Sequence, residues 1–141
     1  KNSVKKLKNK GLIIITVPSH ESLQFKFGKK DWLHLDTPRH LNIFSLKSFN
    51  NLINETNVKI ISYKSVSLYL EFYGWFQTII NKISRDKNSF FKFLMKIDRN
   101  KFIFSIGFLQ LIVLIIPCII ISLITNLLNK GSTVEIVLKK E

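Results

Sequence analysis

The sequence has little of what disulfide-bonded or metal-bound domains need. Its 141 residues include only one cysteine, Cys118, together with five glycines and three prolines. A single cysteine excludes an internal disulfide, and no Cys/His spacing suits a zinc site. The start of the chain carries no signal-peptide pattern. We therefore expect no metal ion and a cytoplasmic, reducing setting.

Acidic residues are also scarce. The sequence contains nine Asp and Glu residues and 22 Lys and Arg residues, which gives a formal net charge of +13. A balance of this size is typical of proteins that meet nucleic acid, anionic lipid or an acidic substrate. The excess is mostly lysine, and Lys, Asn and Ile are abundant together, as an AT-rich genome would produce. Without an arginine-rich arm or a zinc finger, we expect no nucleic-acid partner.

Charge is missing altogether between residues 102 and 129. These 28 residues exceed the roughly 20 that a helix needs to cross a bilayer. Pro117 lies near the middle of the run, where it would bend a helix. A strand predicted after the run has to rejoin its sheet, so both ends of the run should lie on the same side of any membrane.

Two interpretations of this run stay open. It forms a helical hairpin, bent at Pro117, that enters the inner face of the cytoplasmic membrane. Alternatively, it forms an apolar helix pair that packs on the domain or on a second copy in a homodimer. The basic residues of 82–101 would suit anionic headgroups in the first case.

Three segments predict β-strands: 12–17, 58–66 and 133–138. The first is a continuous β-branched run that ends at Pro18, a pattern typical of a strand buried on both faces of a parallel sheet. The other two combine β-branched residues with flanking turn signals. An α/β fold follows from these strands and the helices between them.

Helices are predicted around the strands. Ser45 has the chemistry of an N-cap for a helix that contains Phe49, and residues 68–97 give one or two amphipathic helices. Residues 1–10 read as the end of a helix with Gly11 as its C-cap. Residues 19–44 are predicted to form a loop. Because the chain begins at Lys1, inside a helix-like stretch, we expect it to be part of a larger domain.

Residues 27–45 carry the most informative motif, FGKKDWLHLDTPRHLNIFS. Together with the strand before it, this segment resembles the later half of class I S-adenosylmethionine-dependent methyltransferases, in a bacterial family similar to the ubiquinone-biosynthesis methyltransferases. Those proteins carry a loop of the form W…LDxPRHLxxFS between a strand and a helix. The resemblance covers most of residues 5–66 and resumes at 131–137.

The resemblance implies the C-terminal half of a Rossmann-like, doubly wound fold. The three strands would be the last three of that fold, with the final strand antiparallel between its two predecessors. Residues 1–67 and 131–141 would belong to the methyltransferase domain, and 68–130 would be a hydrophobic helical insert. The cofactor would be S-adenosylmethionine, held mainly by a glycine-rich turn that this chain lacks, so no cofactor-binding residue is assigned and the chain alone is expected to be inactive.

The loop after Pro18 leaves the carboxyl end of a strand, where ligands bind in open α/β sheets. His40 is the candidate general base, since its unperturbed pKa lies near neutrality. The candidate substrate-binding residues, for a small-molecule or lipid acceptor, are Trp32, His34, Asp36 and Arg39. The alternative is structural: the PRHL segment forms a tight turn in which Arg39 pairs with Asp36 and His40 caps the helix.

Two other functions compete with the methyltransferase. One is a small basic membrane-associated protein without catalytic activity, in which the apolar run is an anchor. The other is a nonenzymatic adaptor left by a truncated gene. The DNA upstream of the codon for Lys1 separates them, because only the methyltransferase requires an in-frame glycine-rich segment there.

Overall fold

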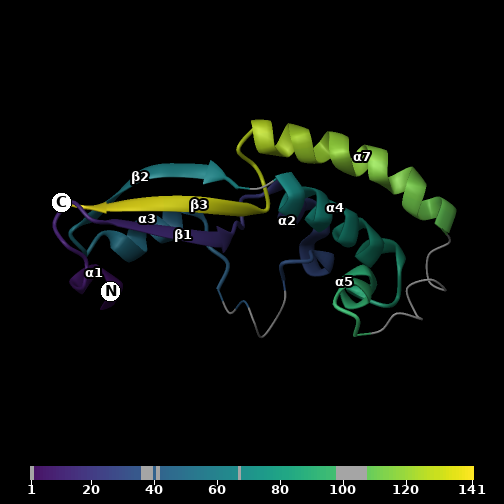
Figure 1. The fold of residues 1–141 in the computed structure, drawn as a ribbon, viewed down its shortest axis with the longest axis horizontal. Coiled ribbons are helices and arrows are strands. Elements are labelled where there is room, and N and C mark those ends of the chain that lie inside the picture. The colour runs from purple at the N-terminus through teal and green to yellow at the C-terminus, as the bar shows by residue number, and fades with distance from the viewer. Residues whose placement is uncertain (1, 36–39, 41, 67, 98–107) are drawn as a thin grey trace.

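The computed structural model describes residues 2–35, 40, 42–66, 68–97 and 108–141, with only the backbone described in 108–111. In chain order, the elements are α1 (Asn2–Lys5), β1 (Leu12–Pro18), α2 (Leu23–Gly28), the short 3-10 helix η1 (Lys29–Asp31), α3 (Leu46–Ile53), β2 (Val58–Ser65), α4 (Leu68–Ile83), α5 (Ser89–Leu94), α7 (Phe108–Leu127) and β3 (Thr133–Lys140). Figure 1 shows two regions side by side. The sheet region consists of the three strands and α3, and the helical region consists of α2, α4, α5 and α7.

The sheet has the order β1-β3-β2, and β3 is antiparallel to both neighbours. The register runs from Leu12 opposite Lys139 to Pro18 opposite Thr133 on one side of β3. On the other side, the pairing with β2 shifts between Ile60 and Ser62. The prediction of one sheet with the last strand antiparallel and in the middle is confirmed, and the fold is mixed α/β.

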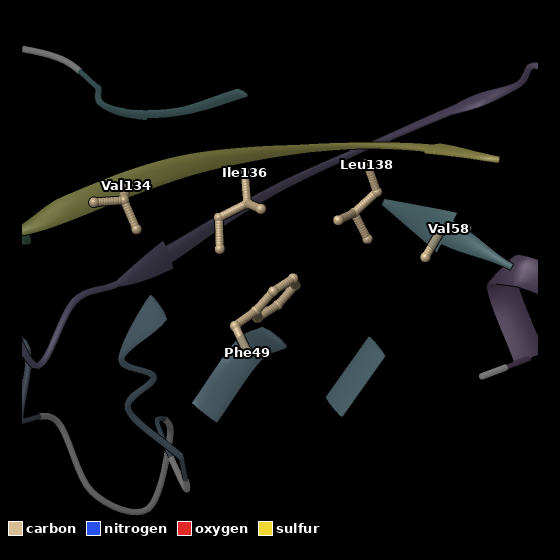
Figure 2. Close-up of a cluster of buried hydrophobic side chains, with 5 residues drawn as sticks. All are labelled: Phe49, Val58, Val134, Ile136 and Leu138. Carbon is tan, nitrogen blue, oxygen red and sulfur yellow. The ribbon is translucent and has the colours of Figure 1, made fainter. Parts of the chain in front are cut away.

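The core of the sheet region lies on the face that α3 covers. Figure 2 shows the side chain of Phe49, from α3, pointing toward Val134, Ile136 and Leu138 on the central strand. Ser45 caps α3 as predicted, because its Oγ accepts a hydrogen bond from the backbone N–H of Ser48 and the Ser48 side chain bonds back to the N-cap. The capped helix fixes Phe49 under the middle of the sheet.

The opposite face of the sheet is open in the described part of the chain. Leu12 and Ile14 of β1 are 53% and 63% exposed, whereas their neighbour Ile13 packs against the Phe49 cluster. The expectation that β1 is buried on both faces is therefore wrong for the described residues. The reason is that side chains alternate along a strand and α3 covers only one side.

The helical insert leaves the sheet and returns to it at the same end. The N–H of Val66, just after β2, donates to the carbonyl of Thr133 at 3.1 Å, and the N–H of Gly131 donates to Ser65 Oγ at 3.0 Å. Between these points, α4 runs away from the sheet and α7 returns alongside it (Figure 1). The two ends of the insert therefore lie together, as the strand order requires.

Pro117 does not reverse the chain. It lies inside α7, which continues as one helix from Phe108 to Leu127, so the predicted hairpin bend at Pro117 is wrong. Proline removes one backbone hydrogen bond, but packing of α7 against α4 extends to residues on both sides of it, such as Leu114 and Cys118. Among the residues that the structure describes, no helix combines the length and apolar character of a membrane span.

The N-terminal helix is shorter than predicted. It ends at Lys5, and Gly11 lies six positions beyond it rather than at its C-cap. The left-handed conformation is adopted by Lys10, with φ of 61°. The carbonyl of Gly11 accepts a hydrogen bond from the N–H of Lys140 at 3.0 Å, which ties this segment to the end of β3.

Candidate functional site

The site predicted from sequence lies at the end of the sheet where β1 and β2 finish. Ser19, directly after β1, donates its N–H to the carbonyl of Ser132 at 2.9 Å, and its Oγ lies 3.4 Å from the hydroxyl of Tyr63. The next residue, His20, donates its N–H to the carbonyl of Phe44 at 3.0 Å. These bonds hold the loop after β1 against the segment that leads into α3.

Part of this loop is helical, which the sequence did not reveal. Ser22 caps α2 by accepting a hydrogen bond from the N–H of Phe25 at 3.1 Å. The helix has only six residues, and Lys29 ends it with φ of 49°. Gly28 allows α2 to approach α4, because a Cβ at this position would lie 2.6 Å from Thr78 Cγ2.

A row of aromatic rings runs from the end of β1 into the protein. The ring centroids of His20 and Phe25 are 4.3 Å apart, those of Phe25 and Trp32 are 5.3 Å apart, and those of Trp32 and His34 are 5.2 Å apart. The last two pairs meet edge to face, a favourable geometry for aromatic rings. His20 is exposed and His34 is half-buried, so the row connects the surface with the interior.

Trp32 is almost completely buried, and its indole N–H donates to Gln24 Oε1 at 3.2 Å. This hydrogen bond is what a buried indole requires. Trp32 therefore supports the loop from beneath, with His34 against its edge. Phe27, in α2, packs against Trp75 of α4, with 5.4 Å between the ring centroids, and the Lys82 ammonium lies 5.0 Å from the centroid of the Phe27 ring.

His40 is half-buried, and both of its neighbours in sequence lie outside the described residues. Asp36 and Arg39 also lie outside the described residues. The predicted pairing of Arg39 with Asp36 and the role of His40 stay predictions. The structure brings Trp32 and His34 together and places them on the loop that follows β1.

A buried carboxyl group next to this loop lies at the centre of a polar cluster. Glu71, on α4, is 3% exposed. Its Oε1 accepts from Gln24 Nε2 at 2.9 Å and lies 3.0 Å from Thr125 Oγ1. Its Oε2 accepts from the N–H of Ser132 at 2.6 Å and from its hydroxyl at 2.8 Å. Glu71 thus joins α2, α4, α7 and the start of β3.

Two features explain why this cluster packs without a gap. Gly74 leaves room for Gln24, since a Cβ at that position would lie 2.4 Å from Gln24 Oε1. Gln24 Nε2 also donates to the backbone carbonyl of Glu71 at 2.9 Å, so both of its amide protons are used. Every oxygen of the Glu71 carboxyl has a donor, which a buried carboxyl needs. The cluster is therefore a structural link between the two regions.

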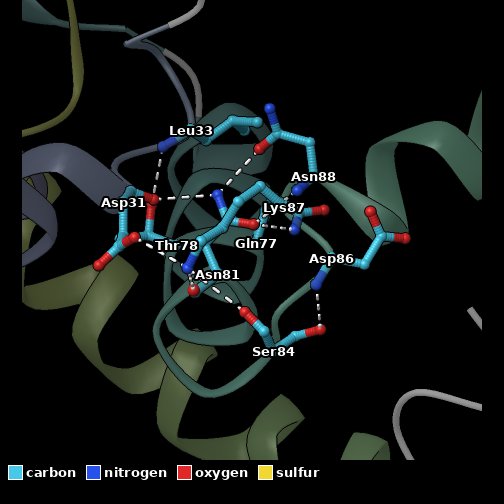
Figure 3. Close-up of polar contacts among 9 residues, drawn as sticks. All are labelled: Asp31, Leu33, Gln77, Thr78, Asn81, Ser84, Asp86, Lys87 and Asn88. Carbon is cyan, nitrogen blue, oxygen red and sulfur yellow. Dashed lines mark hydrogen bonds and ion pairs between the residues drawn. The ribbon is translucent and has the colours of Figure 1, made fainter.

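A second polar network lies at the other end of α4 (Figure 3). Asn81 donates to the carbonyl of Asp31 at 2.9 Å and to Asn88 Oδ1 at 2.8 Å, and it accepts from Gln77 at 2.8 Å. Lys87 forms an ion pair with Asp31 at 3.0 Å. The hydrogen bond from the Lys87 ammonium keeps the pKa of Asp31 below its usual value. This network anchors η1 and the start of α5 to α4.

None of these clusters is a metal centre. The described residues contain no group of three His, Cys, Asp or Glu side chains that could hold an ion. Cys118 is fully buried on α7, and burial raises the pKa of its thiol to about 11, so the thiol is protonated at neutral pH. A protonated buried thiol is neither a metal ligand nor a nucleophile.

The chain lacks the glycine-rich turn by which the expected fold would hold S-adenosylmethionine. A glycine-rich turn needs closely spaced glycines, and no G-x-G segment occurs in the chain. Three of the glycines, Gly28, Gly74 and Gly131, instead stand where side chains of neighbouring elements approach the backbone. No protein-family model matches this chain, and neither does any curated protein or solved structure.

Proposed function

We propose that the chain is the C-terminal portion of an S-adenosylmethionine-dependent methyltransferase domain and contributes the acceptor side of its active site. The observation that carries the proposal is the strand order β1-β3-β2. It places two parallel strands on either side of a final antiparallel strand, with α3 as the crossover between them. The sequence resemblance predicts this order for the last three strands of that fold.

The outer edge and open face of β1 support the proposal further. In the described part of the chain, β1 pairs with β3 alone, so the backbone groups on its other edge have no strand beside them. Leu12 and Ile14 expose large apolar side chains on the face opposite α3. A preceding strand and its helices would cover both, as expected for a strand inside a doubly wound sheet.

The proposed acceptor side is the loop between β1 and α3. Trp32 and His34 would form its inner wall, and His40 would accept the proton that a hydroxyl acceptor loses. Arg39 and Asp36 would orient the acceptor by charge. The cofactor would supply the methyl group from a site formed by the preceding half of the domain.

Calorimetry on the 141-residue chain tests the first part of this proposal. Titration with S-adenosylmethionine up to about 1 mM should give no saturable heat, because the glycine-rich turn is not in this sequence. The DNA upstream of the codon for Lys1 should encode, in the same reading frame, a predicted β-strand followed by a D-x-G-x-G-x-G segment. Saturable binding by the chain alone, or an upstream sequence without that segment, would contradict the proposal.

A second candidate is a small basic membrane-associated protein without catalytic activity. The observation that favours it is α7, whose outer side chains are aliphatic and exposed from Ile112 onward. The same upstream sequence decides between the candidates. A start codon directly before the codon for Lys1, with no glycine-rich segment in frame, favours this second function.

A further inference from the structure

Within the helical region, α7 buries several polar side chains and exposes a large aliphatic surface. On α7, the side that faces α4 carries Cys118, Ser122 and Thr125, each exposed by no more than 1%. Among the described side chains of α7, those exposed on the other side are all apolar, and they are Ile112, Val113, Ile115, Ile116, Pro117, Ile119, Ile120, Leu123, Ile124 and Leu127. A helix in water buries its aliphatic side and exposes its polar side.

The exposed side of α7 is too wide for one protein contact. With about 100° of rotation per residue, the exposed apolar positions of α7 cover about 200° of the helix circumference. The α4-facing residues, from Leu114 to Thr125, occupy the remaining side. A second copy of the chain packing helix to helix would cover one stripe and leave the rest in water. Lipid acyl chains would cover the whole arc.

The apolar surface continues from α7 onto α4. A groove of about 430 Å³ lies between the two helices and is lined by Leu68, Tyr69, Phe72, Ile119 and Ser122. Tyr69 is largely exposed at the rim of the groove, and its phenol suits the boundary between an apolar layer and water. Apart from the hydroxyl groups of Tyr69 and Ser122, the side chains that line this groove are apolar.

The interior of the helical region suits the same environment. Its buried polar groups bond to one another, as Glu71 does with Thr125 and Gln77 does with Asn81. Small residues such as Gly74 and Ser122 lie at the buried helix surfaces. Helices that meet within lipid show this combination, because acyl chains offer polar groups no partner.

The segments that flank α7 in the sequence are basic. Residues 82–97 contain five basic side chains and one acidic one, and the basic ones are Lys82, Arg85, Lys87, Lys92 and Lys96. Lys130 follows the other end of α7. Basic residues beside an apolar helix attract anionic lipid headgroups. Charge therefore favours a membrane over a second copy of this strongly basic chain, which would repel it.

We propose that the outer face of α7 lies in the acyl layer of an anionic membrane, to which the basic residues that flank α7 in the sequence add electrostatic attraction. This docking is independent of the proposed methyl transfer, and it needs neither cofactor nor acceptor. Figure 1 shows α7 along one side of the molecule, with no other described element on its outer face. The sheet region would remain in water beside the lipid surface.

Vesicle flotation tests the proposal on the 141-residue chain. Vesicles of phosphatidylcholine with about 30% phosphatidylglycerol should carry the chain to the top of a gradient. Pure phosphatidylcholine vesicles should bind it at least about tenfold more weakly. The double variant Ile116→Glu with Ile120→Glu should weaken binding to the anionic vesicles at least about tenfold, because both charges would enter the acyl layer.

Two controls make the result decisive. Leu52→Glu, on the exposed side of α3, adds a charge at an exposed leucine of the sheet region and should leave binding unchanged. Arg85→Gln with Lys96→Gln should weaken binding to anionic vesicles and leave binding to neutral ones unaltered. All five substituted positions are exposed, so we expect each variant to fold. Far-UV circular dichroism checks that it does.

Three outcomes would overturn the proposal. One is absence of flotation with anionic vesicles. Another is equal flotation of wild type and the Ile116→Glu, Ile120→Glu variant. The third is a stable dimer in sedimentation that the same variant dissociates and that does not float, which would assign the face to a second copy. None of these measurements contains S-adenosylmethionine, so failure here leaves the methyltransferase proposal intact.

Discussion

In the sheet region, Phe49 packs beneath Val134, Ile136 and Leu138, and every fully buried position of this cluster is apolar. In the helical region, Trp75, Phe76 and Ile80 share the interior with buried Glu71, Gln77 and Thr125. The first region follows the rule for a protein in water, in which burial of apolar area provides the stability. The second depends on hydrogen bonds inside and leaves aliphatic surface outside. Mutations in the sheet region should therefore change stability mainly through lost apolar burial, and mutations of the buried polar residues in the helical region mainly through lost hydrogen bonds.

The largest effect is expected at Glu71. Glu71→Ala removes an acceptor of Gln24, Thr125 and Ser132, and it leaves the backbone N–H of Ser132 and one amide proton of Gln24 buried without an acceptor. The free energy of unfolding should fall by about 3–5 kcal/mol, as it does when a buried polar network loses its central group. Urea denaturation measures it. Glu141→Ala, at a carboxylate that is 62% exposed, should change stability by less than about 0.5 kcal/mol. A loss below about 1 kcal/mol at Glu71 would show that the cluster does not hold the regions together.

The second prediction compares the loss of unfolding free energy on truncating two isoleucines, one in each region. Ile136 is 1% exposed on β3, whereas Ile120 is 53% exposed on α7. Ile136→Ala should lower the free energy of unfolding in water by about 2–5 kcal/mol, because it leaves a cavity above Phe49. Ile120→Ala should change it by less than about 0.5 kcal/mol. Similar losses at both positions would mean that the outer face of α7 is buried in solution, and the contrast between the regions would then fail.

Gly74→Ala should have an intermediate effect. The new Cβ would lie 2.4 Å from Gln24 Oε1, so the Gln24 side chain has to move away from Glu71. We expect a loss of about 1–3 kcal/mol in unfolding free energy. A double-mutant cycle tests this contact. Gln24→Ala should lower the free energy of unfolding less in the Gly74→Ala variant than in wild type, because the contact between Gln24 and Glu71 is already lost there. Additive losses would contradict the proposed contact.

The smallest effect is expected at the surface pair of Asp31 and Lys87. The ion pair lowers the pKa of Asp31 in the folded state, so its contribution is present above the unfolded pKa of about 3.9 and is lost as the pH falls through the folded value. Asp31→Asn should therefore melt slightly below wild type at pH 7. At about pH 2 the two proteins should melt at the same temperature. A difference that persists at pH 2 would have a cause other than the ion pair.

The strands and α3 could be predicted because their signals are local. The β-branched runs gave 12–17, 58–66 and 133–138, and the structure extends the first and last by one and two residues. Ser45 is the N-cap that its sequence context indicates. Burial on both faces of β1 was expected from its continuous apolar run, but only α3 covers the described sheet.

Other features depend on contacts that sequence patterns do not reveal. The Glu71 cluster joins residues 47 to 61 positions apart in the chain. The six-residue helix α2 is too short to present a helical apolar stripe, although Ser22 marks its start. Pro117 was expected to bend the chain, yet packing along α4 keeps α7 continuous through it. In each case tertiary contacts override the local signal.

The proposed acceptor-side assignment is the central claim, and methyl transfer by a protein that contains this chain together with the proposed preceding half of the domain tests it most directly. If His40 is the general base, as proposed, single-turnover rates with labelled S-adenosylmethionine should fall by a factor of about 10² or more in His40→Ala. The matched variant His20→Ala, at an exposed histidine on the same loop, should stay within about twofold of wild type. Equal rates for wild type and His40→Ala, or a larger loss for His20→Ala, would contradict the assignment.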